Sequence, residues 1–101
     1  MKLTDGQIQN IVDHLPHGSG IDLDWVWERK GKKVHCYNSF HYRDENGFYD
    51  GWQDFVLILF CGKENKLDFV VESVGGWSRR LAAAGLRDYL EDLFANSLPS
   101  D

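Results

Sequence analysis

The sequence lacks any apolar segment long enough to cross a membrane. Its longest uninterrupted apolar run is seven residues, from Phe55 to Cys61, whereas a spanning helix needs roughly 20. The opening residues, Met1 to Gly6, contain no apolar stretch of the kind that marks a secretory signal. These two absences predict a cytoplasmic protein with no membrane partner.

Cysteine and basic clusters are also scarce. Cys36 and Cys61 are the only two cysteines and do not form a CxxC pair. In a reducing compartment both stay thiols, so we expect neither a disulfide nor a metal site built on cysteine. Sixteen acidic residues oppose 11 basic ones, for a net charge of −5. Binding to nucleic-acid phosphates depends on clustered Lys and Arg, so we expect no nucleic-acid partner.

What is present is the composition of a globular protein. Apolar residues make up 43% of the chain and charged residues 27%, which is typical of a folded soluble domain. A length of 101 residues, with no repeat or linker-like segment, predicts a single domain over 1–101.

Helices are predicted at the two ends of the chain. Thr4 and Gln7 have the spacing of a capping box, and Pro16 ends the helix that follows. The last helix is expected to start near Ser78, and two alternatives stay open: it is continuous through Gly85, or Gly85 divides it into two pieces. The apolar stripes of the two helices are Ile8, Ile11, Val12 and Leu15, and Leu86, Tyr89, Leu90, Leu93 and Phe94.

Between the helices, apolar alternation and turn residues predict strands. Their expected bounds are about 21–30, 33–42, 53–61 and 66–73, with a turn at Gly31-Lys32 and a break at Gly75-Gly76. Connections this short join antiparallel neighbours. The predicted fold class is α+β: a two-layer sandwich with a four-stranded antiparallel meander and the N- and C-terminal helices on one face, in the order α-β-β-β-β-α.

The turns also predict a register. They place Trp27 opposite Cys36, Cys36 opposite Cys61 through a loop centred near 48–49, and Cys61 opposite Leu67. The face that these residues share is apolar apart from Asn38, so we expect the helices to cover it.

The opposite face of the predicted sheet is apolar as well, and no further segment is available to cover it. Its predicted rows are Val26–Tyr37–Phe60–Asp68, Asp24–Ser39–Ile58–Val70 and Asp22–His41–Val56–Glu72. Apolar patches rimmed by polar groups often mark binding surfaces. The residues predicted to form the interface are Val26, Tyr37, His41, Val56, Ile58, Phe60 and Val70.

We therefore expect a non-enzymatic protein-binding module, most simply a homodimer around a two-fold axis. Two alternatives stay open for the second face. The tail or the loop 43–52 covers it, or a small sheet tolerates the exposure.

Signals for chemistry are weak. No HExxH motif joins the four histidines, and the predicted row of Asp22, His41 and Glu72 is typical of solvated ion pairs. We expect no catalytic residue, no metal and no cofactor. The alternative from a different class is a small-molecule-binding or weakly hydrolytic protein that uses the loops around His17, Trp52 and Trp77.

Three segments, 18–22 (GSGID), 50–55 (DGWQDF) and 86–92 (LRDYLED), resemble small uncharacterised proteins of bacteria, their phages and other mobile elements. The resemblance implies an accessory protein of such an element, a group that includes small, acidic, dimeric inhibitors of host defence. It implies no activity, cofactor or catalytic residue.

Overall fold

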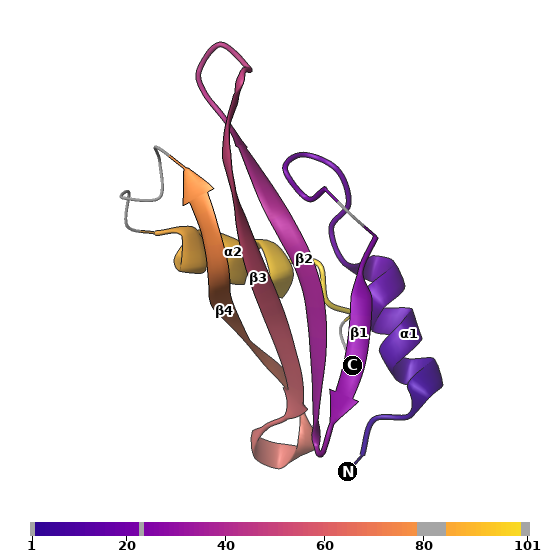
Figure 1. Ribbon diagram of the computed structural model, residues 1–101. Coiled ribbons are helices and arrows are strands. Elements are labelled where there is room, and N and C mark those ends of the chain that lie inside the picture. Colours follow the sequence, from indigo (N-terminus) through magenta and orange to yellow (C-terminus); the bar gives the residue numbers. More distant parts are fainter. Residues whose placement is uncertain (1, 23, 79–84, 100–101) are drawn as a thin grey trace.

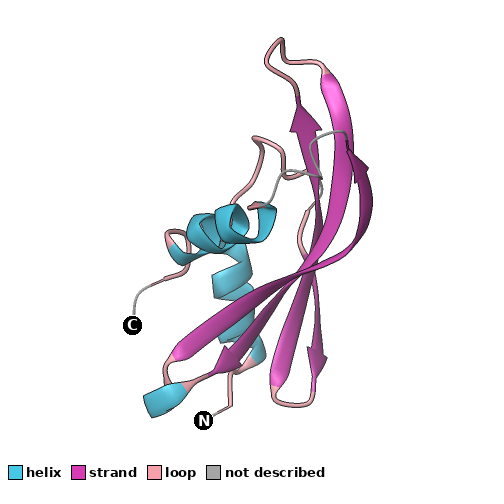
Figure 2. Cartoon of the chain, turned by 90° about the vertical axis from the view of Figure 1, so that its left-hand side faces the viewer, coloured by secondary structure: helices cyan, strands magenta, loops and turns pink. Residues whose placement is uncertain are grey.

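The computed structural model describes residues 2–22, 24–78 and 85–99. Four antiparallel strands lie in the order β1-β2-β3-β4, and both helices lie on one side of the sheet (Figures 1 and 2). The predicted α+β fold and its element order are thus confirmed. The elements are α1 (Asp5–His14), β1 (Val26–Lys30), β2 (Lys33–Arg43), β3 (Tyr49–Cys61), a 3-10 turn (Lys63–Asn65), β4 (Leu67–Ser78) and α2 (Leu86–Ala95).

Helix α1 begins with the predicted capping box. The Thr4 hydroxyl accepts the Gln7 backbone N–H at 3.2 Å, and the Gln7 side-chain oxygen accepts the Thr4 N–H at 2.8 Å. Two N–H groups that the first turn leaves free are satisfied in this way. Leu15 ends the helix in an extended conformation, as expected of a residue that precedes a proline.

Helix α2 begins at Leu86, directly after Gly85, whose φ is 119°. Ser78, the expected start, is the last residue of β4, and a first helical piece before Gly85 would fall on residues 79–84. Residues 79–84 lie outside the described part of the chain. Leu90 and Phe94 are fully buried, whereas Tyr89 is half-exposed, so the buried stripe is narrower than expected. Neither described helix is long and apolar enough to span a membrane.

The core lies between the helices and the sheet, with Trp25 at its centre. The Trp25 ring meets Phe55 of β3 and Phe94 of α2 edge-on, at centroid distances of 5.8 and 5.4 Å. Its indole N–H donates to the carbonyl oxygen of Pro16 at 3.0 Å. Trp25 therefore joins both helical segments to the sheet. The predicted core polar residue, Asn38, is 6% exposed, and its side-chain oxygen accepts the Ser39 N–H.

Two of the three predicted cross-strand pairs are confirmed. Trp27 is opposite Cys36, and Cys61 is opposite Leu67. The third is wrong, because Cys36 pairs with Leu57 rather than with Cys61. A displacement of four residues is even, so every side chain keeps its predicted face.

The error arises from the β2–β3 loop, which is shorter than expected. The Asp44 carboxylate accepts the N–H groups of Asn46 and Phe48, both at 2.9 Å, and Gly47 takes a φ of 83°. This side-chain cap closes a tight hairpin. The hairpin extends beyond the helical layer (Figure 2).

Strand β4 is longer than predicted, because it continues through Gly75 and Gly76. Asp54 pairs with Gly75 and Phe55 with Ser73, which leaves Val74 as the extra residue of a β-bulge. A Cβ atom at residue 76 would lie 2.4 Å from the carbonyl oxygen of Trp52, so glycine is needed for this close approach. At the other edge, regular pairing in β1 begins at Val26 instead of residue 21.

Candidate binding face

We call the side of the sheet opposite the helices the open face. The corrected register places four cross-strand rows on it: Glu28–His35–Ile58–Val70, Val26–Tyr37–Val56–Glu72, Ser39–Asp54–Gly75 and His41–Trp52–Trp77. Phe60 and Asp68 pair beyond the first of these rows. All seven predicted interface residues therefore share one face, but their rows differ from the predicted ones.

The middle of the open face is less exposed than its apolar composition suggested. Val56 is 4% exposed and Ile58 is 5% exposed, although no described helix lies on this side (Figure 2). Side chains of neighbouring strands flank both residues within their rows. Exposed apolar area lies instead on the outer strands, at Val26 (65%), Val70 (38%) and Val74 (64%), and in the end row, at Trp52 (37%) and Trp77 (57%).

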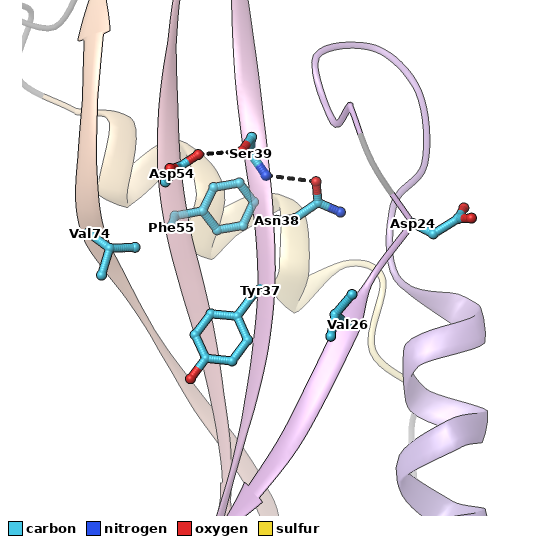
Figure 3. A pocket seen from close by; sticks show the side chains of 8 residues that line it. All are labelled: Asp24, Val26, Tyr37, Asn38, Ser39, Asp54, Phe55 and Val74. Atoms are coloured by element: carbon cyan, nitrogen blue, oxygen red, sulfur yellow. Dashed lines mark hydrogen bonds between the residues drawn. The ribbon is translucent and has the colours of Figure 1, made fainter.

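A pocket of about 420 Å³ opens on this face beside the bulge. Val26, Tyr37 and Val74 supply apolar walls from three strands (Figure 3). The remaining lining residues are Asp24, Asn38, Ser39, Asp54 and Phe55. An apolar cavity with a few polar groups is the usual form of a binding site.

The polar side of the pocket is organised by one hydrogen bond. The Ser39 hydroxyl donates to the Asp54 carboxylate from the adjacent strand (Figure 3). Asp54 is partly buried and Asp24 is exposed. Neither carboxylate forms an ion pair with another described residue. The pocket therefore presents negative charge beside apolar walls.

Two lysines lie at the other end of the open face. The Lys30 Nζ is 5.8 Å from the centre of the Tyr37 ring, and the Lys33 Nζ is 5.8 Å from that of Phe60. Hydrogen bonding to Tyr37 raises the pKa of Lys30. Partial burial and the nearby Lys30 lower the pKa of His35. The two lysines thus share one end of the face with Asp68, and the pocket carboxylates lie towards the other end.

The expected row of Asp22, His41 and Glu72 is broken by the corrected register. His41 Nε2 lies 3.4 Å from an Asp22 carboxylate oxygen, but Glu72 lies opposite Val56. The Ser39 hydroxyl donates to Asp54 rather than to a histidine. Ser39 and His41 therefore form no serine–histidine pair.

The three residues of the alternative function are only partly brought together. Trp52 and Trp77 are cross-strand neighbours, 37% and 57% exposed. His17 lies in the exposed loop before Ile21. None of the three lines the pocket.

The described residues give little support to a cysteine nucleophile or to a metal site. Burial raises the pKa of the Cys36 thiol to about 12, so it is not a nucleophile near neutral pH. No group of three or more His, Cys, Asp or Glu side chains within residues 2–22, 24–78 and 85–99 has the arrangement of a metal site. The chain matches no family model, and searches of curated proteins and of solved structures found no match.

Proposed function

We propose that the chain is a non-enzymatic protein-binding module that acts through the open face, most simply by pairing with a second copy of itself. The observation that carries this proposal is the exposure of Val26 and Val74 at a concave pocket, and of Val70 elsewhere on β4, on a sheet face that no described helix covers. Exposed apolar surface bordered by charge is the usual layout of a protein interface.

The state of the potential nucleophiles supports a binding role over an enzymatic one. The Ser39 hydroxyl is engaged by a carboxylate, and the Cys36 thiol is buried with a raised pKa. Nucleophilic catalysis by either residue would need that group activated by a neighbouring base. The resemblance of the sequence to small proteins of bacteria and mobile elements extends the proposal to an accessory role in such an element.

The second candidate is a small-molecule-binding protein. The pocket volume of about 420 Å³ falls within the range of roughly 300–1,000 Å³ common for ligand sites. This observation favours a site beside Tyr37 and Val74 over the loops around His17.

Self-association is tested by sedimentation equilibrium from low to high micromolar concentration. We expect a monomer–dimer equilibrium that Val74→Asp weakens at least about tenfold, because the new carboxylate would be desolvated in the interface. Phe48→Asp is the matched control, since Phe48 is 70% exposed on the hairpin tip, away from the pocket. A wild-type chain that stays monomeric at high micromolar concentration would contradict the homodimer.

A further inference from the structure

On β1 and β2 the open face separates its charges along the strands, while Asp68 of β4 lies at the same end as the lysines. Lys33 and Ser39 are six residues apart on β2, which corresponds to about 20 Å. Lys30 lies beside Lys33 at one end of the face. Asp24 and Asp54 line the pocket towards the other end. Lys30 and Lys33 of the same chain are therefore too far along the strands to fill the pocket.

The pocket has the chemistry of a lysine site. Its walls of Val26, Tyr37 and Val74 suit an aliphatic stem, and its carboxylates suit an ammonium group at the end of that stem. No described cation pairs with either carboxylate. An occupant that brings a lysine would therefore bury apolar surface and compensate the negative charge together.

We propose that a second copy of the chain supplies this lysine, and that Lys30 of each subunit reaches Asp24 of its partner. The inference rests on the proposed homodimer and specifies its geometry. A two-fold axis across the strands, passing between the rows of His35 and Tyr37, exchanges the two ends of the face. Each β1 then faces the partner's β1, so the Lys30 end of one strand meets the Asp24 end of the other.

The middle rows are compatible with this arrangement. On β1, Glu28 meets Val26 of the partner subunit, and on β4, Val70 meets Glu72 of the partner subunit. No two like charges come opposite each other in these rows, and Glu28 and Glu72 lie on the two edge strands, at the polar rim of the interface. The apolar side chains around them supply the area that the interface buries.

A two-fold axis parallel to the strands is less favourable. It would place pocket against pocket, so Asp24 and Asp54 of both subunits would gather at one place. Like charges brought together in this way oppose association. The axis across the strands is therefore favoured, because it brings a lysine to each pocket.

A charge exchange tests the contact. Lys30 and Asp24 are both exposed, so Lys30→Glu and Asp24→Lys should each leave the fold intact, as circular dichroism would verify. Each change creates like-charge contacts at both symmetric sites. We expect each variant alone to dimerise at least about tenfold more weakly than the wild type.

In the mixed dimer, one contact is an opposite-charge pair of reversed sign and the other is the original Lys30–Asp24 pair, whereas the double variant reverses both contacts. We expect the equimolar mixture to form heterodimers with an affinity close to that of the wild type, and the double variant to form homodimers again. Lys63→Glu and Asp13→Lys make the same charge changes at exposed residues outside the open face, so neither should alter the dissociation constant. All measurements use sedimentation equilibrium at low salt.

The outcomes separate this inference from the proposed function. A wild-type dimer that neither charge reversal weakens, or two weakened variants that do not recover when mixed, would overturn the Lys30–Asp24 contact and leave the homodimer standing. A monomeric wild type would overturn both.

Discussion

The two faces of the sheet are built from the same strands, yet their apolar side chains are shielded from solvent in different ways. On β3, Phe55, Leu57 and Leu59 face the helices and are no more than 1% exposed. Their neighbours Val56 and Ile58 face the other side and are also buried, with no described helix over them. One layer is closed by helices, whereas on the other face only the middle is shielded and the outer strands remain exposed. Apolar character on both faces of a strand therefore does not imply helices on both sides.

The largest expected difference between the two faces is in how much stability the protein loses when a side chain is truncated. Phe94→Ala removes the ring that contacts Trp25 and Phe55, so it should lower the free energy of unfolding by about 3–5 kcal/mol. Val26→Ala, on the exposed rim of the open face, should change it by less than about 0.5 kcal/mol. Urea denaturation at concentrations where the chain is monomeric measures both. Similar losses would show that the open face is part of the core.

A smaller difference is expected at the bulge. Gly75 and Gly76 have nearly the same φ, 155° and 153°, but only a Cβ at residue 76 would meet another atom within 4 Å. Gly75→Ala should lower the free energy of unfolding by about 1 kcal/mol, through backbone strain alone. Gly76→Ala should cost at least about 2 kcal/mol, because strand β4 must also move away from β3. Equal losses in thermal denaturation would remove steric contact as the reason for glycine at residue 76.

The smallest effect concerns pH and the open face. Because the folded state lowers the pKa of His35 below 6.5, the unfolded chain takes up a proton there more readily. The contribution of His35 to stability is therefore complete above pH 6.5 and falls as the pH drops through 6.5 towards the folded pKa. In urea denaturation, the His35→Gln variant should lose less stability than the wild type as the pH falls below 6.5. An identical pH dependence in both proteins would contradict this assignment.

Local signals explain what could be predicted from the sequence. The capping box at Thr4 and the turn at Gly31-Lys32 depend on a few adjacent residues, and the structure confirms both. The assignment of side chains to faces depends only on alternation, so it survives the shift in β2–β3 pairing. Two registers that differ by four residues have the same alternation, and only the short loop capped by Asp44 separates them.

The pocket could not be predicted, because it depends on the two features that sequence reasoning missed. The corrected β2–β3 register places Ser39 opposite Asp54, and the bulge places Val74 beside them. The glycine pair after Val74 is typical of a chain break, and only the close approach of Gly76 to β3 explains why the strand continues. The burial of Val56 depends on the volumes of its neighbours, which a pattern of polar and apolar residues does not contain.

The tip of the β2–β3 hairpin is held by hydrogen bonds within its own loop. Asp44 and Phe48 exchange backbone and side-chain hydrogen bonds within the loop, and the tip extends past the helical layer (Figure 2). Its conformation is thus set by its own few residues. A reporter group attached to the exposed side chain of Glu45 would keep these hydrogen bonds and the register that they set, which makes this end of the molecule a neutral handle for attaching the protein to a surface or a probe.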